Sequence, residues 1–399
     1  MEKLEIGLKV IHPNWKPIIK KNIPELHKVL SHILEDVSIE QLTPNIEDVF
    51  KAFRIDPNGI RVVIIGQDPY PGCDSKSKQK YANGLSFSTT AKTTPASLRN
   101  IFSCLNRLGY KTESNDLMPW LLQGVFLLNM SLTTQVGITR KHSDIWKTFI
   151  SNIIGDLSIM HKGSKLSFML WGKDAQSLEC HIKGKHNVLK WSHPSPMADN
   201  QLEDSKKFIN CNHFDDLKCI NWNTGDRIVI YTDGGGFVEG KCSFGIYWTD
   251  ILKLGGLVQS YEYELKDYIH TTSVHKTPTS QRGEYLAMCY ALWIIDMFGL
   301  KNVLIITDSQ NVKGILTEWS KKDEKYKNDD LVKIMRSIYN KNKKYIDIEH
   351  VKSHCKEASI YNKGNEIADK IASNMLKTDV PFKIEYLKVD FNLVIKGSV

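Results

Sequence analysis

Residues 61–70 read RVVIIGQDPY, an apolar run followed directly by a short polar segment. The run at 61–66 is too short for an ordinary helix and rich in β-branched residues, which predicts a strand buried on both faces. Gln67, Asp68 and Tyr70 come directly after it. This order is typical of a parallel sheet, whose ligands bind beyond the carboxyl ends of the strands.

Three further apolar runs in the first half have the same form. They are VFLLN at 125–129, LSFMLW at 166–171 and NVLKW at 187–191, with helical patterns at 95–108, 144–157 and 173–182. Buried strands joined by helices predict a parallel sheet with helices on both faces, a three-layer α/β/α fold. Residues 1–60, punctuated by prolines, are expected to be helices and loops that lead into the sheet.

Polar residues stand where these strands end. Asp68 follows the first strand, Asn129 ends the second, and His193 and Ser195 follow the fourth. Because the carboxyl ends of parallel strands meet at one edge, we expect these side chains to form one site. Turn residues and caps are the alternative explanation for the same pattern.

The composition is that of a globular protein. The 399 residues include 53 Lys and Arg against 45 Asp and Glu, so the formal net charge is +8, which is compatible with nucleic acid as a partner. With 41% hydrophobic and 25% charged residues, the chain is neither collagen-like nor wholly disordered. No apolar run approaches the roughly 20 residues of a spanning helix, and no signal-peptide pattern opens the chain. We therefore expect an intracellular protein without a membrane partner.

The eight cysteines are spread along the chain without a CxxC pair. This spacing favours reduced thiols over a disulfide framework. Cys211, His213 and Cys219, together with Cys180, His181 and His186, could be drawn as a metal cluster, but they match no standard zinc spacing. We interpret them as ordinary core and surface residues.

The pattern changes near residues 221–226, where we place a domain boundary. Runs at 227–232, 242–248 and 259–265 lie close together and predict an antiparallel meander. Apolar residues at helical spacing predict a helix at about 281–298. A strand at 303–307, helices near 311–319 and 330–340, a strand at 345–351 and a helix at 364–376 follow. The expected domains are 1–222 and 227–377, the second with a mixed-sheet α/β fold, and 378–399 is a C-terminal tail.

Four acidic residues of the second half have suggestive positions. Asp233 ends a strand before three glycines, Glu284 opens the long helix, Asp308 ends the strand at 303–307, and Asp369 lies on the last helix. Carboxylates that converge repel one another unless a proton or cation compensates, and Mg²⁺ or Mn²⁺ suits an oxygen-only site. Asp is also a common cap at strand ends, so the positions alone leave both interpretations open.

The first half resembles a family 1 uracil-DNA glycosylase from about residue 60 to 222. The motifs that carry the resemblance occur in the family's order: GQDPY at 66–70, GLSFS at 84–88, PASL at 95–98, LLN and LT within 127–133, HPSP at 193–196 and CNHF at 211–214. The last motif also accounts for two of the residues considered for a zinc site.

This resemblance implies hydrolytic excision of uracil from DNA after the nucleotide is flipped out, without a cofactor. Asp68 would stabilise the sugar cation and orient or deprotonate water, while a neutral His193 would donate a hydrogen bond to the uracil oxygen. Phe87 would stack on the base and Tyr70 would exclude the methyl group of thymine. The implied uracil-binding residues are Gln67, Tyr70, Phe87 and Asn129. The implied DNA-binding residues are Ser97, Ser192, Ser195 and the wedge Met197.

Three features depart from this family's pattern. Pro71 stands where the family usually has His, which bears on the positioning of water. Met197 replaces Leu, a mild change because Met is also apolar and flexible. The stretch around 74–80 is an insertion with three lysines, which we interpret mainly as a solvated loop rather than as phosphate contacts.

The second half resembles type 1 ribonuclease H over about residues 227–376. The motifs are TDG at 232–234, SQRGE at 280–284, DSQ at 308–310, VKSH at 351–354 and GNEIAD at 364–369. The resemblance implies two Mg²⁺ or Mn²⁺ ions held by the four carboxylates and cleavage of RNA paired with DNA. It assigns His354 to proton transfer or product release. It assigns hybrid binding to Gln281, Gln310 and Trp319.

The two resemblances together predict an α/β protein with two catalytic domains. The expected partners are uracil-containing DNA and RNA–DNA hybrids, with replication proteins as a further candidate class. The alternative is a DNA-binding replication accessory scaffold in which one or both sites are inactive. Intact Asp68, Asn129 and His193, together with all four carboxylates, argue against a pure scaffold.

Overall fold

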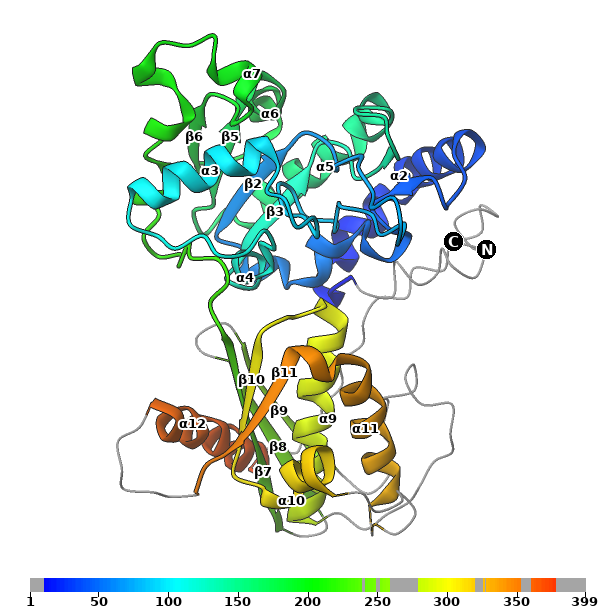
Figure 1. The fold of residues 1–399 in the computed structure, drawn as a ribbon, viewed down its shortest axis with the longest axis vertical. Coiled ribbons are helices and arrows are strands. Elements are labelled where there is room, and N and C mark those ends of the chain that lie inside the picture. Colours follow the sequence, from blue (N-terminus) through cyan, green and yellow to red (C-terminus); the bar gives the residue numbers. More distant parts are fainter. Residues whose placement is uncertain are drawn as a thin grey trace. The chain divides into compact units, whose positions relative to one another are not determined.

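A computed structural model gives the structure of the protein (Figure 1). It describes residues 11–238, 241–248, 252–258, 279–319, 326, 328–352 and 360–377. The described residues up to Gly225 form one compact unit, and those from Asp226 onward form a second. Among the helices of these segments, none combines the length and the apolar character needed to cross a bilayer.

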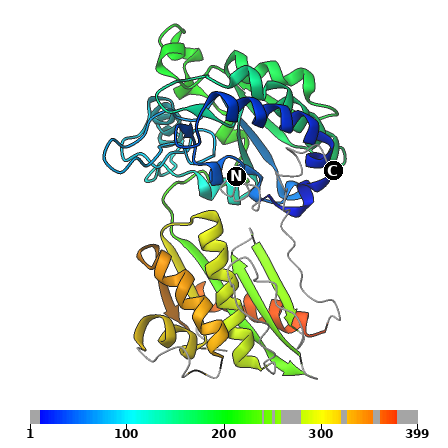
Figure 2. The same cartoon turned by 90° about the vertical axis from the view of Figure 1, so that its right-hand side faces the viewer.

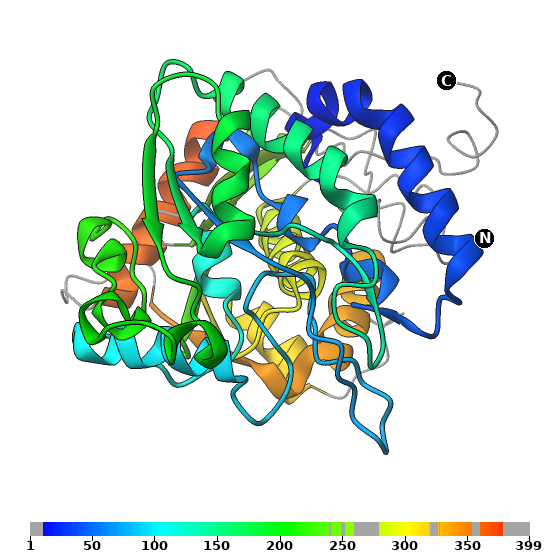
Figure 3. The same cartoon turned by 90° about the horizontal axis from the view of Figure 1, so that it is seen from above.

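The first unit is built on a four-stranded parallel sheet, and the predicted fold class is confirmed. Its strand order is β3–β2–β5–β6, namely β3 (Val125–Asn129), β2 (Val62–Gly66), β5 (Ser167–Trp171) and β6 (Asn187–Trp191). Every residue of β2 and β3 is buried, as their apolar sequences require. Figure 3 places α3 (Ala96–Arg107) on one side of the strands and α5 (Ser143–Met160) and α2 (Lys16–Asp36) on the other.

Short elements complete the first unit. The remaining α-helices are α4 (Met118–Leu122), α6 (Gly172–Gln176), α7 (Pro196–Asp199) and α8 (His213–Asp216). The helix predicted at 173–182 is therefore α6 followed by a 3₁₀ helix, Ser177–His181. Other 3₁₀ helices are Pro13–Trp15, Ile46–Asp48, Lys51–Arg54, Pro57–Gly59, Asp204–Lys206 and Phe208–Asn210. A small antiparallel ribbon joins β1 (Leu42–Thr43) to β4 (Thr134–Gln135).

The insertion around 74–80 forms an ordered turn. Oδ1 of Asp74 accepts hydrogen bonds from the backbone N–H groups of Lys76 (3.0 Å) and Ser77 (2.7 Å). The side chains of Lys76 and Lys78 are exposed, whereas Nζ of Lys80 donates to a backbone carbonyl (3.3 Å). The exposure of two of these three lysines agrees with a solvated loop.

The second unit contains a five-stranded mixed sheet. Its order is β11–β10–β7–β8–β9, namely β11 (Ile346–His350), β10 (Val303–Thr307), β7 (Ile228–Val238), β8 (Lys241–Trp248) and β9 (Leu252–Val258). The pairs β11–β10 and β10–β7 are parallel, and the other two are antiparallel. Figures 1 and 2 place α9 (Ser280–Phe298) and α11 (Asp329–Asn342) on one face and α12 (Ile360–Met375) on the other.

A strand that the sequence analysis did not predict pairs with β8. It is β9, Leu252–Val258, and Leu252 pairs with Trp248 directly after a short connection. The predicted segment 259–265 lies outside the described residues. Gly255 and Gly256 explain the omission, because glycine normally weakens a strand, whereas here both positions pair with β8.

The segment predicted as one helix at 311–319 consists of two short helical segments of different type. It consists of α10 (Gln310–Lys313) and one π-helical turn, Gly314–Glu318. The predicted tail 378–399 lies outside the described residues. The other predicted strands and helices of this half agree with β10, β11, α11 and α12 to within a few residues at their ends.

We expect the replacement Ile64→Ala to destabilise the first unit strongly. Ile64 lies at the middle of β2 and is fully buried, so truncation leaves a cavity that costs about 2–5 kcal/mol in the free energy of unfolding. Ile159→Ala is the matched control, because that side chain on α5 is 44% exposed. Urea unfolding of both variants checks the prediction, which fails if their midpoints shift equally.

Candidate active sites

The carboxyl edge of the parallel sheet brings together the segments that follow β2 and β3. Gly66 and Asn129, the last residues of these strands, are register partners. The N–H of Met130 donates to the carbonyl of Gly66 (2.9 Å), and the N–H of Ser131 donates to that of Gln67 (3.1 Å). The QDPY segment and Asn129 therefore leave the sheet side by side.

The side chain of Asn129 is buried against a glycine. A Cβ on Gly66 would lie 2.3 Å from Oδ1 of Asn129 and 2.7 Å from Cβ of Ser86, which is closer than non-bonded atoms approach. The position therefore requires glycine. Asn129 is only 6% exposed, so its amide is held at the sheet edge, where it can offer both a donor and an acceptor to a ligand.

Asp68 is half-buried at the same edge. Its Oδ2 accepts a hydrogen bond from the backbone N–H of Arg140 (2.7 Å). Burial raises the pKa of Asp68, and the hydrogen bond and positive charge of Arg140 oppose this rise. The carboxylate is thus oriented by the backbone while its other oxygen remains available for chemistry.

His193 is held in a defined tautomer. Its Nδ1 accepts the backbone N–H of Ser195 (3.0 Å), so the neutral ring carries its proton on Nε2. Burial lowers the pKa of His193, and the charge of Asp174 partly opposes this effect. Gly172, at φ +85°, gives the ring space, because a Cβ there would lie 2.8 Å from Cβ of His193. The neutral imidazole can therefore donate from Nε2.

An aromatic cluster lies beside His193. The ring centroid of Phe87 is 5.5 Å from that of Trp171 and 6.2 Å from that of His193. The hydroxyl of Tyr70 donates to the carbonyl of Phe87 (3.2 Å), and burial raises the pKa of Tyr70, which keeps it neutral. The indole N–H of Trp171 donates to Nδ1 of His213 (3.1 Å), so the histidine considered for a zinc site is used in packing.

The predicted DNA-binding residues have different local environments. Ser97 lies in the first turn of α3 and is half-buried. The hydroxyl of Ser192 donates to the carbonyl of Lys206 (3.1 Å), and that of Ser195 caps α7 by accepting the N–H of Ala198 (3.4 Å). Met197, on α7, is 79% exposed, as a side chain that enters DNA would be.

Sequence reasoning missed two residues of this site. Asp174 lies on α6 directly after β5, and its Oδ2 accepts hydrogen bonds from Nε2 of Gln67 (2.9 Å) and Nη2 of Arg140 (3.1 Å). The rule that ligands bind beyond strand ends could have identified Asp174. Arg140 lies eleven positions beyond the end of β3, in a loop with no motif, so its sequence offers no comparable signal.

Pro71 faces the same loop. Its carbonyl accepts the N–H of Gly137 (2.9 Å), which ties the segment after Tyr70 to the loop that carries Arg140. The backbone after Tyr70 is therefore anchored with a proline at position 71.

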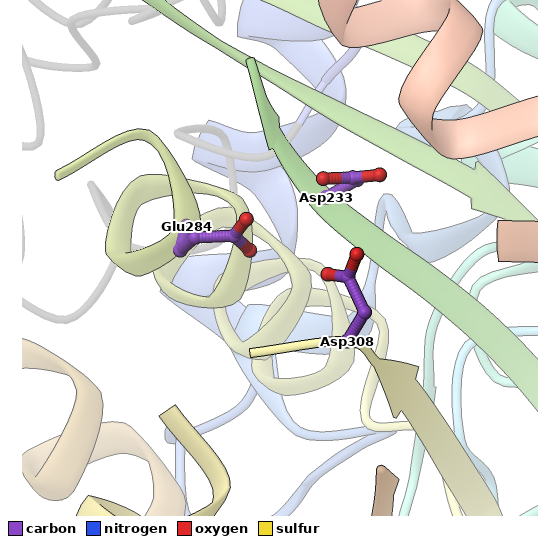
Figure 4. A group of neighbouring side chains, drawn as sticks. All are labelled: Asp233, Glu284 and Asp308. Carbon is purple, nitrogen blue, oxygen red and sulfur yellow. The ribbon is translucent and has the colours of Figure 1, made fainter. Parts of the chain in front are cut away.

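The second unit brings three predicted carboxylates together (Figure 4). Asp233 comes from β7, Glu284 from the first turns of α9 and Asp308 from the end of β10, and one oxygen of each lies within 4.8 Å of the others. A close approach of β7 and α9 makes this possible. A Cβ on Gly234 would lie 2.3 Å from the backbone nitrogen of Glu284.

The electrostatics of this cluster call for a compensating charge. Burial and then the neighbouring carboxylates Asp308 and Asp369 raise the pKa of Asp233. Burial, Asp233 and Asp308 raise the pKa of Glu284 in the same way. Oε2 of Glu284 is buried and has no hydrogen-bond partner within the described segments. An all-oxygen donor set of this kind suits a proton or a hard divalent cation.

The other predicted site residues of the second unit do not belong to this group of three converging carboxylates. Asp369, on α12, acts on Asp233 through its charge and accepts a hydrogen bond from Ser373 (3.3 Å), but it is not one of the three converging carboxylates. Gln281 donates to the hydroxyl of Tyr285 (3.2 Å). Gln310 is exposed at the start of α10, Trp319 is 39% exposed, and His354 lies outside the described residues.

Arg282 supports Glu284 from inside the fold. Its guanidinium is fully buried and binds both carboxylate oxygens of Asp330 at the start of α11. It also donates to Oδ1 of Asn328 (3.2 Å). This bidentate pair fixes the first turn of α9 against α11. Arg282 belongs to the SQRGE segment, but sequence reasoning gave it no role.

Comparisons with known proteins agree with this division. A family model of the uracil DNA glycosylase superfamily matches residues 53–216, and an RNase H model matches residues 225–377. A uracil-DNA glycosylase of Alkaliphilus metalliredigens is 34% identical over 228 residues, which are 97% of that protein and 54% of this chain. One of Amoebophilus asiaticus is 38% identical over 224 residues, 98% of that protein and 53% of this chain. The crystal structure of mimivirus uracil-DNA glycosylase matches at a TM-score of 0.49 and 29% identity, covering 55% of this chain and 89% of that one.

We expect the stability of the second unit in EDTA to fall as the pH rises above about 4. Asp233 and Glu284 have raised pKa values in the fold, so the folded unit holds protons that the unfolded chain releases near its ordinary carboxyl pKa. Deprotonation at higher pH then costs stability. Asp308→Asn removes one charge and should reduce this loss, as measured by urea midpoints between pH 5 and 9.

Glu349→Gln is the control for this prediction. Glu349 is an exposed carboxylate on β11, so its replacement should leave the pH dependence close to that of the unchanged chain. Equal slopes for all three proteins would contradict the assignment of the repulsion to the acidic cluster.

Proposed function

The chain belongs to the uracil-DNA glycosylase superfamily in its N-terminal part and contains an RNase H domain in its C-terminal part, and we propose that it carries out both activities. These memberships support uracil excision and nuclease activity in general. The specific proposal is hydrolysis of the bond between uracil and deoxyribose, together with metal-dependent cleavage of RNA in RNA–DNA hybrids.

The excision proposal depends on one observation above all. Asp68, His193 and the buried amide of Asn129 lie at or just beyond the carboxyl ends of strands of one parallel sheet. A uracil in duplex DNA must first be flipped out of the stack, at a cost of a few kcal/mol. Bound at this edge, its polar face meets the Asn129 amide and its ring meets Phe87.

The two titratable groups then act on opposite charges. As the N-glycosidic bond breaks, positive charge develops on the sugar and negative charge on the base. Asp68 stabilises the sugar cation and orients the attacking water. Neutral His193 donates from Nε2 to the uracil oxygen that gains negative charge. Tyr70, fixed by its bond to the Phe87 carbonyl, limits the space for a methyl group on the base.

The nuclease proposal depends on the convergence of Asp233, Glu284 and Asp308. These carboxylates, joined by Asp369, are the residues that would hold Mg²⁺ or Mn²⁺. In two-metal sites the ions activate water and stabilise the leaving oxygen. The buried Oε2 of Glu284 and the raised pKa values of this cluster support a cation as the missing partner. Arg282 keeps Glu284 in place through Asp330.

Recognition of the hybrid is proposed for residues around this cluster. Gln281 and Gln310 are candidates for contacts with 2′-hydroxyl groups or bases in the minor groove. The indole of Trp319 packs against Gly314, where a Cβ would lie 2.4 Å from the ring. This contact holds the ring in place, and we propose that a nucleotide stacks on it. His354 is proposed to assist proton transfer or product release.

One substrate can test both activities. It is an RNA–DNA hybrid with a single deoxyuridine in the DNA strand and a different label on each strand, compared with single-stranded uracil DNA. We expect alkali-sensitive breaks in DNA in both Mg²⁺ and EDTA, and RNA fragments only in Mg²⁺. Loss of excision in EDTA, or RNA cleavage in EDTA, would contradict the proposal.

The two sites provide matched controls for each other. Asp68→Asn should lower excision by about 10²-fold or more and leave RNA cleavage unchanged. Asp308→Asn should have the reverse effect, because it removes a proposed metal ligand. If the unchanged chain binds the hybrid but yields neither product, the accessory-scaffold alternative is correct.

We expect Met197→Ala to separate double-stranded from single-stranded substrates. Met197 is 79% exposed on α7 and is proposed to fill the space left by the flipped nucleotide. Because single-stranded DNA needs no such filling, excision from duplex DNA should fall roughly tenfold and excision from single-stranded DNA should hardly change. Met160→Ala, at the end of α5 and 38% exposed, is the control. Equal losses on both substrates would rule out a wedge.

A further inference from the structure

Asp174 connects three parts of the N-terminal site. Its Oδ2 accepts the side-chain amide of Gln67 (2.9 Å), which follows β2. The same oxygen accepts Nη2 of Arg140 (3.1 Å), which comes from the loop before α5. The charge of Asp174 also acts on His193, which follows β6. One carboxylate therefore touches or influences groups from three separate segments.

The backbone and the side chain of Arg140 bind different carboxylates. Its N–H binds Asp68 (2.7 Å), and its φ of +61° is a left-handed conformation that glycine adopts more easily than other residues. The loop has further anchors, because the hydroxyl of Thr134 donates to the carbonyl of Ile138 (2.7 Å) and accepts the N–H of Lys141 (3.2 Å). The guanidinium is therefore not required to shape the loop.

The ion pair contributes little to folding. The side chains of Arg140 and Asp174 are 56% and 49% exposed, and ion pairs in such positions typically stabilise a fold by less than about 1 kcal/mol. Their location beside reacting groups points instead to a role in the reaction. A negative charge at Asp174 opposes the anion that forms on the leaving uracil unless a positive charge balances it.

We propose that Arg140 and Asp174 form a positioning pair, in which Asp174 orients the amide of Gln67 toward the base and Arg140 neutralises the charge of Asp174 near the leaving group. This inference rests on the proposed uracil excision. Neither residue touches the reacting atoms in this scheme. Asp174 acts through Gln67 and through the field at His193. Arg140 acts through Asp174, and its charge also favours the ionised form of Asp68.

Two single variants and their combination test the pair. Arg140→Gly keeps the left-handed backbone and the N–H to Asp68 but removes the guanidinium. Asp174→Asn keeps an oxygen that accepts the Gln67 amide but removes the charge. We expect kcat for excision to fall roughly threefold to tenfold in Arg140→Gly. In Asp174→Asn it should fall by less, because the neutral amide oxygen accepts the Gln67 amide more weakly than a carboxylate does.

The double variant carries the decisive measurement. Adding Asp174→Asn to Arg140→Gly removes the unbalanced charge, so kcat should rise above that of Arg140→Gly and approach that of Asp174→Asn. A merely structural role predicts the opposite, that two lost contacts are at least as harmful as one. Urea midpoints of all three variants should match that of the unchanged chain, and a fall in midpoint that parallels kcat would overturn the inference.

The pH dependence of kcat offers an independent readout. The groups that face His193 are the Asp174 carboxylate, the Phe87 ring and the Ser195 N–H. Without Arg140, the unbalanced charge of Asp174 favours the imidazolium, so the acidic limb of the profile should move to higher pH. In the double variant the part of this shift that comes from His193 should disappear, whereas the part that comes from Asp68, which has lost the charge of Arg140, should remain. An acidic limb that stays in place in Arg140→Gly would contradict the inference.

Two control variants complete the design. Glu179→Gln breaks an ion pair with Lys190 whose side chains are 44% and 47% exposed, a close match to the pair under test. Asn302→Gly relaxes a left-handed backbone position at φ +56° in the other unit. Both should leave kcat unchanged. If the unchanged chain excises no uracil, the proposed function fails and this inference with it. If that chain is active and all variants equal it, only this inference fails.

Discussion

Both sites depend on close contacts that only a glycine permits. In the N-terminal unit, Gly66 lets the Asn129 amide lie against β2, and Gly172 gives His193 its place. In the C-terminal unit, Gly234 lets the start of α9 reach β7, which brings Glu284 to Asp233. A methyl group at any of these positions would separate residues that must act together. The sheets supply the frame, and these contacts set the distances within it.

Burial shifts the pKa values of the titratable residues in both sites, but with different consequences. In the first, it raises the pKa of Asp68 and lowers that of His193, so each group approaches neutrality from its own side. Hydrogen bonds from backbone N–H groups then orient both. In the second, burial raises the pKa values of Asp233 and Glu284 together, and the neighbouring carboxylates raise them further. In the first site the positive charge of Arg140 balances the negative charge of Asp68 in part. The carboxylates of the second site require a proton or a cation.

The sequence predicts most of the frame and the groups at strand ends, because burial and periodicity leave direct traces in it. The parallel sheet, Asp68 and the three converging carboxylates follow from such traces. The prediction from sequence fails where a loop places a side chain in the site or where a strand contains residues that strands usually lack. Arg140 reaches Asp68 through a left-handed turn that its residue type does not suggest. The glycines of β9 conceal a strand that pairing with β8 determines.

This difference in charge balance separates the conditions under which the two sites can work. The excision chemistry proposed here needs an ionised Asp68 and a neutral His193, both favoured as the pH rises through the neutral range. The carboxylates of the second site lose protons less readily in the same range, but a bound divalent cation would favour their ionised form. Under the proposed function, a divalent cation would therefore favour the charged form of the second site, whereas excision at the first site is proposed to need none. The two activities that we propose for this chain would therefore respond to different variables, the first to pH and the second to the supply of divalent cation.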